Sequence, residues 1–272
     1  MPGVVTAAER IAAARTLLFV PADRPERFDK ALAAGADLVI VDLEDAVAPA
    51  MKDAARANLA DWLSAERPVL VRVNVPASPQ FSEDLALCAH AGVLAVVLPK
   101  ASAESAMLAA AAAAKPIVAL IETAQGIADI AAVAGTEGVA RLAMGAIDLA
   151  GDLGLGAEDS LVDPFRLQMT LASRLAGIAA PVDGVTAAFK DEARLASDVS
   201  RARALGFSGK LCIHPLQLAA VRVGFAATPE QIAWAQRVVE ADAGAAGRAV
   251  QVDGEMVDKP VVDRARRILA AR

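Results

Sequence analysis

Two carboxylates in the sequence directly follow apolar segments. Glu122 ends the segment ALIE, and Asp148 follows the segment LAMGAI. A carboxylate beside such a segment is partly desolvated, and a hard divalent cation relieves that cost. Two carboxylates, waters and substrate oxygens form a usual ligand shell of Mg²⁺. The pattern therefore predicts a Mg²⁺ site, although the spacing gives equal weight to Glu122 capping the next helix and Asp148 making a loop hydrogen bond.

A single arginine lies inside another apolar segment. Arg72 belongs to VLVRVNV, and Asn74 shares its face of an extended strand because side chains alternate there. A guanidinium in this setting needs an anion. It would hold a substrate carboxylate through two parallel hydrogen bonds, or it would pair with the crowded acids of VDLED, which are Asp42, Glu44 and Asp45. We favour the substrate carboxylate.

Lys100, at the end of VVLPK, offers a different chemistry. A lysine whose pKa is lowered by burial can form a Schiff base with a keto substrate. A salt bridge to neighbouring acids is the structural alternative.

Other polar groups carry weaker signals. Asp183 and His214 follow later apolar segments, and His90 is expected on a helix in a structural role. The sequence GDLGLG matches neither a dinucleotide fingerprint nor a Walker A motif, so its glycines are more typical of tight turns.

Eight short apolar segments are positioned to present these side chains. They are residues 16–20, 38–41, 69–73, 93–98, 117–121, 139–144, 178–182 and 210–213. Because they are continuously apolar, each is predicted to be buried on both faces, as in a parallel sheet covered by helices. Eight βα units in about 250 residues are typical of an α/β (β/α)8 TIM barrel, whose catalytic residues lie at the carboxyl ends of the strands.

Helix signals separate the predicted strands. Helix starts are expected near Pro25, Ser82 and Ser102, and helix ends are expected near Gly35, Gly92 and Gly206. Thr228 and Pro229 open another helix through about Ala243, Gly244 and Gly247 interrupt it, and Ala249 to Asp258 is expected to form an extra strand or turn. We therefore predict a barrel domain at 1–228 and a short C-terminal extension at 229–272, which is expected to pack on a neighbouring subunit.

Composition excludes several classes of protein. The 272 residues are 56% hydrophobic and 3% aromatic, which predicts a large core of small aliphatic side chains and excludes a disordered chain. The net charge of −6, without a basic stripe, argues against a nucleic-acid partner. Cys88 and Cys212 have no paired spacing and are expected to be reduced core thiols. With no signal peptide and no apolar run near the roughly 20 residues of a membrane span, the protein is expected in the cytoplasm, with no membrane partner.

Seven segments in order carry a family resemblance. They are RTLLFVPADRPERFDKALAAGADLVIVDLEDAV, VLVRVN, VVLPKA, ALIETAQGI, MGAIDLAGDLG, GFSGKLCIHPLQ and VDGEMVDKPVVDRARRIL. Together they resemble the citrate lyase beta-subunit-like branch of the hydroxyacid aldolase and lyase family, over nearly the whole chain from Arg15. The resemblance implies a (β/α)8 barrel, Mg²⁺, and cleavage or formation of a carbon–carbon bond between a keto acid and an acyl-CoA enolate.

The resemblance also implies roles for residues at the predicted mouth of the barrel. Glu122 and Asp148 match the Mg²⁺ ligands, and Arg72 matches the arginine that holds the substrate carboxylate. The acidic cluster around the metal-bound waters is matched by Asp42, Glu44 and Asp45.

Further implied roles concern coenzyme A and a neighbouring subunit. Arg24 and Lys30 match basic positions that meet coenzyme A phosphates. Asp258 matches an aspartate that a neighbouring subunit delivers as an acid/base, which implies a homo-oligomer, with a homotrimer favoured; capping of the helix after Pro260 is the alternative. The family's frequent glutamate before the metal aspartate is replaced here by Ile147, so citryl-CoA is not assigned as the substrate.

The expected reaction is cleavage of a citryl-, malyl- or citramalyl-like 3-hydroxy-acyl-CoA into a small keto acid and an acyl-CoA. Two alternatives remain open at this point: a Mg²⁺-dependent aldolase that acts on free keto acids, and a Schiff-base aldolase that uses Lys100. The chain is expected to work either alone or within a larger lyase complex.

Overall fold

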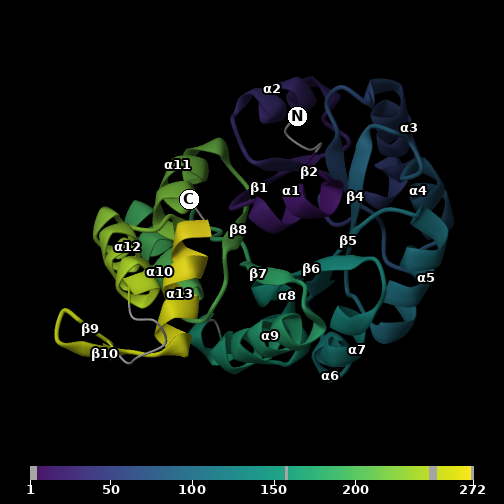
Figure 1. The fold of residues 1–272 in the computed structure, drawn as a ribbon. Helices are drawn as coiled ribbons and strands as arrows, with labels where there is room; N and C mark the ends of the chain where they lie inside the picture. Colours follow the sequence, from purple (N-terminus) through teal and green to yellow (C-terminus); the bar gives the residue numbers. More distant parts are fainter. Residues whose placement is uncertain (1–4, 157–158, 245–249, 271–272) are drawn as a thin grey trace. The chain divides into compact units, whose positions relative to one another are not determined.

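The computed structural model describes residues 5–156, 159–244 and 250–270. Eight parallel strands close into a barrel in sequence order, as predicted (Figure 1). They are β1 (Thr16–Pro21), β2 (Leu38–Asp42), β3 (Val69–Arg72), β4 (Val93–Leu98), β5 (Ile117–Ile121), β6 (Val139–Met144), β7 (Ala179–Asp183) and β8 (Gly209–Cys212). Pairing of β1 with β8, which sets Thr16 opposite Lys210, closes the ring.

The interior of the barrel is filled by aliphatic side chains of modest size. Leu17, Ile40, Leu70, Val97 and Val118 belong to this buried cluster. The opposite faces of the strands are also largely buried, because the helices cover them. The continuous apolar runs of the sequence therefore serve two cores at once, as expected for a parallel barrel.

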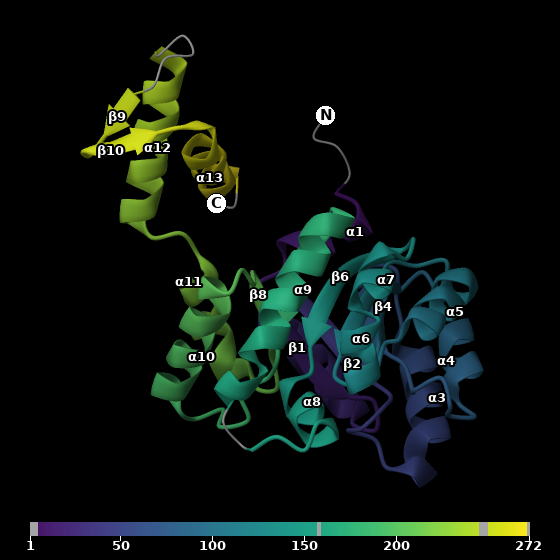
Figure 2. The same ribbon diagram turned by 90° about the horizontal axis from the view of Figure 1, so that it is seen from below.

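Helices alternate with the strands and lie outside the barrel (Figure 2). Longer helices are α1 (Ala7–Ala13), α2 (Phe28–Ala33), α3 (Lys52–Trp62), α4 (Phe81–Leu87), α5 (Ala103–Ala113), α6 (Ala124–Ala128), α7 (Ile130–Gly135), α8 (Ala146–Asp152), α9 (Asp163–Ala176), α10 (Glu192–Ala204) and α11 (Leu218–Phe225). Short 3-10 turns are η1 (Pro25–Arg27), η2 (Pro49–Met51), η3 (Asp159–Val162) and η4 (Pro215–Gln217).

Several predicted helix boundaries are confirmed. Pro25 starts η1, and the hydroxyl of Ser102 caps α5 by accepting a hydrogen bond from Ser105 N. Gly35 and Gly206 follow α2 and α10 with φ of 80° and 93°, a conformation that favours glycine.

The expected helix start near Ser82 is confirmed, because α4 begins at Phe81 and has Glu83 and Asp84 in its first turn. Two other expectations around α4 are wrong in detail. His90 lies in the turn beyond α4, where its Nδ1 accepts a hydrogen bond from Gly92 N. Gly92 does not end the helix. A glycine is needed there for close packing, because a Cβ would lie 2.7 Å from Ser64 N.

Helix α1 lies against the barrel (Figure 1), and its Ile11 belongs to the buried cluster of the interior. One buried arginine, Arg141, bonds the end of this helix to the strands. The Arg141 guanidinium, on β6, donates to the carbonyls of Ile11 and Ala14 at 2.6 and 2.7 Å. It also donates to the Ala180 carbonyl and the Ser208 hydroxyl at 2.7 and 2.8 Å. Burial lowers the pKa of Arg141 to about 9, which leaves it charged at neutral pH. Four oxygen acceptors thus replace the water that this cation has lost.

We expect Arg141→Met to lower the free energy of unfolding by about 2–4 kcal/mol, because several buried carbonyl groups lose their donor. Urea denaturation followed by circular dichroism measures this change. Arg27→Met, at an exposed position of η1, is the matched control and should change stability by less than about 0.5 kcal/mol. Equal stability of the two variants would contradict the role given to Arg141.

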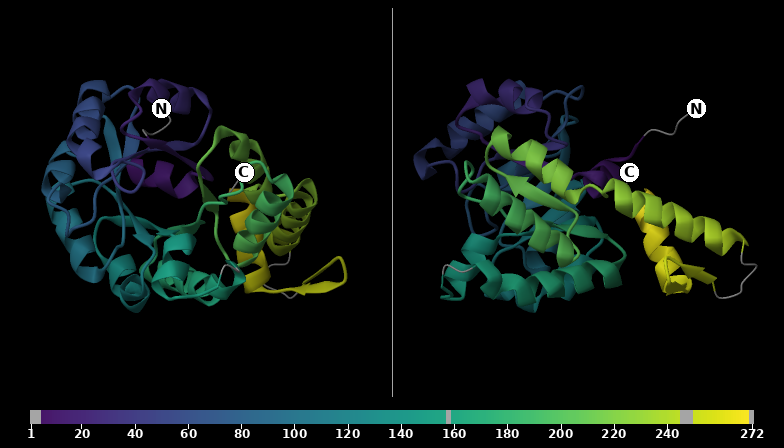
Figure 3. Two further views of the ribbon diagram at one scale, coloured as in Figure 1. Left: turned by 180° about the vertical axis from the view of Figure 1, so that it is seen from behind. Right: turned by 90° about the vertical axis from the view of Figure 1, so that its left-hand side faces the viewer.

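The chain divides into two compact units, Met1–Gly224 and Phe225–Arg272. The second unit contains α12 (Pro229–Gly244), the hairpin of β9 (Val250–Val252) and β10 (Glu255–Val257), and α13 (Lys259–Ala270), at the yellow end of the colour scale in Figure 3. The predicted helix and the predicted extra strand region are present, while Gly247 and Ala249 lie outside the described residues. Ala235, Val238 and Val262 form part of a small buried cluster within the unit.

Two further sequence expectations concern the whole chain. Cys88 and Cys212 are buried free thiols, and burial raises the pKa of each to about 12. Within the described ranges, no helix is both long and apolar enough to cross a membrane.

Candidate active site

The parallel register places a carboxylate and a guanidinium side by side at the carboxyl ends of two strands. Asp42, the last residue of β2, lies opposite Arg72, the last residue of β3. Nε and Nη2 of Arg72 donate to the two carboxylate oxygens of Asp42, both at 2.7 Å. Nη1 lies 3.0 Å from Glu44 Oε2, and the ring of Phe19 lies 4.9 Å from the guanidinium carbon. Burial works against the charge of Arg72, but Asp42 and Glu44 outweigh it and raise the pKa above its ordinary value.

Arg72 therefore has the structural partners that the sequence left as the alternative. Its side chain is 11% exposed and lines a cavity at the barrel mouth. Binding of a substrate carboxylate by Arg72 remains a prediction, and the acids behind it would hold the guanidinium in a fixed orientation.

Asp42 organises the acidic loop that follows β2. In addition to Arg72, its carboxylate accepts hydrogen bonds from the backbone N–H groups of Glu44 and Ala46, at 2.9 and 3.2 Å. Four hydrogen bonds within the protein occupy its two oxygens. Asp42 thus fixes the loop geometry, while Asp45, with a side chain 57% exposed, lies at the edge of the same cavity.

Lys100 carries the opposite pKa shift from the one that a Schiff-base lysine requires. Its Nζ lies 2.8 Å from Glu44 Oε1 and 3.8 Å from Asp45 Oδ2. Burial works to lower the pKa of Lys100, but Glu44, Asp45 and Glu122 outweigh it and raise the pKa. Burial, in turn, is the largest cause of a raised pKa at Glu44. The lowered pKa that the Schiff-base alternative requires is therefore absent at Lys100, and the structure shows the salt-bridge alternative.

Reduction with borohydride in the presence of pyruvate should therefore leave Lys100 unmodified. The protonated amine is not nucleophilic, and its partner Glu44 keeps it protonated. Peptide mass spectrometry checks the result. A reduced pyruvyl adduct mapped to Lys100 would restore the Schiff-base mechanism.

Glu122 is buried at the start of the loop after β5. It is 1% exposed, and its Oε1 accepts a hydrogen bond from Lys100 N at 2.8 Å. Its Oε2 faces Gly145, where an added Cβ would lie 2.5 Å from that oxygen. Desolvation is the main cause that raises the pKa of Glu122 to about 8, with Glu44 and Asp148 adding to it. The capping alternative is wrong, because Thr123 caps α6.

Asp148 lies in the first turn of α8 and is exposed, so the expectation that it would be desolvated is wrong. It nevertheless lines the same cavity as Glu122 and is close enough to raise its pKa. One helical turn beyond β6 carries Asp148 away from the apolar strand and toward the rim.

The shared cavity has a volume of about 390 Å³ and is lined by both carboxylates together with Arg72, Asp42 and Asp45. Among the described residues, no group of three His, Cys, Asp or Glu side chains is arranged to hold a metal ion unaided. A Mg²⁺ ion there fits a shell of two carboxylates completed by water or substrate oxygens, the set that this hard cation accepts. The raised pKa of Glu122 fits the same interpretation, because a cation would compensate its buried charge.

Metal affinity should depend on pH through Glu122. A buried acid with a raised pKa makes the metal-free fold less stable, relative to the unfolded chain, as pH rises from about 4.5 to about 8. A cation needs the ionised form, so Mn²⁺ affinity should rise up to about tenfold per pH unit on approaching that pKa. Thermal unfolding with Mn²⁺ and with EDTA should therefore diverge more at pH 8 than at pH 6. The same pH slope in Glu122→Gln would contradict this assignment.

A second polar network, which the sequence did not reveal, supports the acidic loop. Nζ of Lys52 donates to the carbonyls of Leu43 and Glu44, both at 3.0 Å, and also to Asn74 Oδ1. The side-chain amide of buried Asn74 donates to Asp84 Oδ2. The sequence placed Asn74 on the strand face of Arg72 and gave it no partner, and the structure supplies Lys52 and Asp84 as its partners.

Two other candidates contribute elsewhere. Asp183 is buried in an ion network with Arg166 Nε at 2.9 Å and Lys210 Nζ at 2.6 Å. His214 stacks on Phe189, with ring centroids 4.5 Å apart, and its Nδ1 accepts a hydrogen bond from Leu216 N. Neither Asp183 nor His214 lines the cavity that holds the carboxylates.

The two predicted coenzyme A residues do not line that cavity, and the predicted acid/base Asp258 belongs to the second unit. Arg24 follows β1 with a side chain 58% exposed, and Lys30 is exposed on α2. In the second unit, Asp258 Oδ1 accepts a hydrogen bond from Val261 N and caps α13. The capping alternative is therefore present, and it leaves the acid/base role of Asp258 a prediction.

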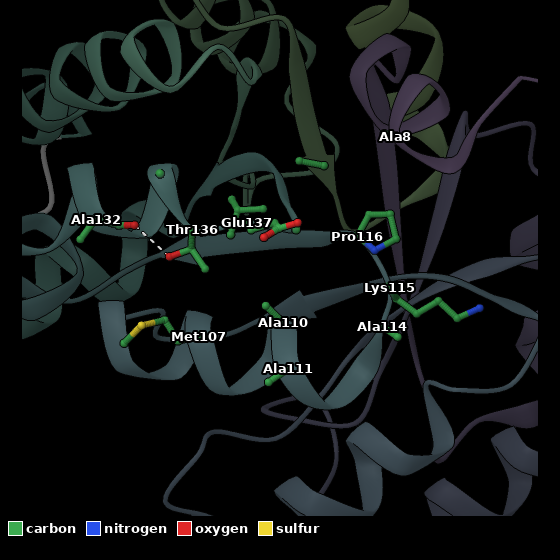
Figure 4. Close-up of a pocket in the computed structure, with 14 residues that line it drawn as sticks. Ala8, Met107, Ala110, Ala111, Ala114, Lys115, Pro116, Ala132, Thr136 and Glu137 are labelled. Carbon is green, nitrogen blue, oxygen red and sulfur yellow. Dashed lines mark hydrogen bonds between the residues drawn. The ribbon is translucent and has the colours of Figure 1, made fainter.

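A larger cavity, of about 920 Å³, lies at the amino ends of β5 and β6 (Figure 4). Alanines of α5 and the side chains of Met107, Pro116 and Thr136 line it, and the Thr136 hydroxyl donates to the Ala132 carbonyl. The carboxylate and guanidinium cluster lies at the other ends of the strands. Volume alone therefore does not identify the reaction site, and the smaller cavity is the better candidate.

Known proteins resemble the chain along most of its length. A model of the HpcH/HpaI aldolase/citrate lyase family matches residues 15–215. A citrate lyase subunit beta-like protein of Mycobacterium tuberculosis is 40% identical over 260 residues, 93% of each chain. A (3S)-malyl-CoA thioesterase of Cereibacter sphaeroides is 37% identical over 273 residues, which cover 94% of this chain and 93% of the relative. The structure of CitE from M. tuberculosis with magnesium, acetoacetate and coenzyme A matches with a TM-score of 0.84 and 37% identity, over 96% of this chain and 98% of that one.

Proposed function

The chain belongs to the HpcH/HpaI aldolase/citrate lyase family, and we propose that it is a Mg²⁺-dependent lyase that cleaves a 3-hydroxy-acyl-CoA into a keto acid and an acyl-CoA. The observation that carries the proposal is the convergence of Glu122, Asp148 and Arg72 on one cavity of about 390 Å³. Two metal-binding carboxylates and an anion-binding group are thus available together. The CitE complex with magnesium, acetoacetate and coenzyme A supports the choice of cofactor and substrate class.

The residues of the cavity have distinct roles in the proposed reaction. When bound to Glu122 and Asp148, Mg²⁺ supplies a Lewis acid for the oxygen that becomes the ketone. Arg72, oriented by Asp42 and Glu44, holds the substrate carboxylate. A water beside the acidic loop takes the hydroxyl proton, and the electrons of the broken carbon–carbon bond remain on the thioester fragment as an enolate. Asp258 of a neighbouring subunit protonates that enolate to the acyl-CoA.

Recognition of coenzyme A is assigned to basic residues beyond β1. Arg24 and Lys30 are exposed, and both carry the charge that phosphate groups require. Their assignment rests on the resemblance of these positions to the family. The same resemblance supports a homo-oligomer, with a homotrimer as the favoured state, either alone or within a larger lyase complex.

Purified protein should be tested with Mg²⁺ on malyl-, citramalyl- and citryl-CoA, with separate assays for keto acid and free thiol. A lyase releases keto acid without free thiol, whereas thioester hydrolysis of the kind named in the C. sphaeroides relative releases thiol. Keto acid release from at least one thioester, lost in EDTA, is the expected result. Turnover of free hydroxy acids alone would favour the aldolase alternative.

A further inference from the structure

The cavity at the barrel mouth has lining residues of two kinds. The polar lining consists of four carboxyl groups and one guanidinium, and Arg72 is the one cation among the described lining residues. The apolar lining, called here the apolar wall, includes Leu120, Met144, Ile147 and Ile213. Any substrate that places one end at the carboxylates must therefore place another substituent against aliphatic side chains.

Ile147 is the most exposed part of this apolar wall. It directly precedes Asp148 on α8 and is 57% exposed, and Ile213 is 41% exposed. A second cavity of about 510 Å³ shares Ala146, Ile147 and Val185 with the first and is lined further by Leu155 and by the ion pair of Arg194 with Asp198. The exposed isoleucine thus lies where the two cavities meet, next in sequence to a proposed metal ligand.

We propose that this apolar wall selects the substrate: the site takes keto acids, and the hydroxyacyl thioesters made from them, that carry one carboxylate and an apolar substituent, and it rejects those with a second carboxylate. The inference rests on the proposed function and makes Ile147 a specificity-determining residue. The first carboxylate of the substrate is neutralised by Arg72 and the metal site.

A second carboxylate would lack a partner in this cavity. Lys100, which follows β4, already lies 2.8 Å from Glu44 and is not among the lining residues. A carboxylate placed against Ile147 meets methyl groups that offer neither a hydrogen bond nor a charge, so this contact displaces part of its hydration without replacement.

A matched pair of stable keto acids tests the proposal without turnover. 2-Oxopentanoate and 2-oxoglutarate have equal carbon number and differ by a terminal methyl against a terminal carboxylate. Calorimetric titration of the Mg²⁺-loaded protein should show that 2-oxopentanoate binds at least about tenfold more tightly than 2-oxoglutarate. Equal affinities, or binding of neither acid, would overturn the proposal.

Ile147→Arg then tests the assigned residue. It places a cation beside the proposed position of the second carboxylate and should shift the affinity ratio at least about tenfold toward 2-oxoglutarate. Leu155→Arg adds the same charge in the neighbouring cavity alone and should leave the ratio unchanged. An unchanged ratio in Ile147→Arg, or the same shift in both variants, would overturn the role of Ile147. The lyase assay tests the proposed reaction separately. A protein that shows the binding preference but cleaves no thioester would refute only the proposed reaction.

Discussion

Glu122→Gln and Asp148→Asn should each lower kcat/KM for thioester cleavage by about a thousandfold or more, because each removes a proposed ligand of the cation that stabilises developing charge. EDTA should have the same effect on the wild-type protein, and Mg²⁺ or Mn²⁺ should reverse it. Steady-state release of keto acid measures the loss, and Mn²⁺ titration checks that each variant has lost metal affinity.

The substitutions separate the metal site from the fold. Glutamine retains an oxygen that can accept the Lys100 N–H, and it removes a carboxyl whose pKa is raised to about 8 by burial. Glu122→Gln should therefore melt no lower than wild-type protein in EDTA at pH 8. Asp148 is exposed, so Asp148→Asn should also keep its melting temperature.

Glu137→Gln is the matched control at the other end of the barrel. Glu137 is exposed and lines the cavity of about 920 Å³. Its substitution should leave kcat/KM within about twofold of wild type, since an exposed side chain remote from the site has little effect. Full activity of Glu122→Gln in EDTA, or a large loss in Glu137→Gln, would contradict the placement of the reaction at the barrel mouth.

The barrel was predictable because its strands repeat one strong signal. Each strand is a short and mainly apolar segment, and the parallel arrangement buries both of its faces. The spacing also indicated that candidate side chains would lie at the carboxyl ends. Register was not predictable from such uniform segments, because a shift of β3 against β2 would remain apolar. The pairing of Asp42 with Arg72 depends on that register and emerged only in the structure.

Local geometry explains why some of the site could not be predicted. Asp148 lies in the first turn of α8, a few residues beyond the end of β6, and is therefore exposed. Lys100 has a φ of 45°, which places its backbone N–H on Glu122 while its side chain reaches Glu44. Neither arrangement follows from residue type. Interactions across long separations, such as Lys52 with Asn74, likewise lack a signature in one sequence.

If Asp258 protonates the enolate, removal of its carboxylate should lower activity about as much as removal of a metal ligand does. Asp258→Asn is expected to lower kcat by about 10²–10⁴-fold, the usual contribution of a positioned acid. Asparagine caps a helix about as well as aspartate, so the hydrogen bond to Val261 N can persist and α13 should stay intact. Rapid-quench measurement of acyl-CoA formation, together with thermal unfolding, distinguishes chemistry from stability.

Subunit mixing tests where Asp258 acts. If a neighbouring subunit supplies it, inactive Asp258→Asn and inactive Glu122→Ala proteins should regain activity when their subunits exchange, because some interfaces then combine both native residues. Tagged subunits establish that exchange has occurred, and size measurement of the assembly tests the homotrimer. Exchange without recovery would confine Asp258 to its own chain or to the helix cap. Wild-type turnover by Asp258→Asn alone would leave only the cap, since a group whose loss costs nothing cannot be the acid that protonates the enolate.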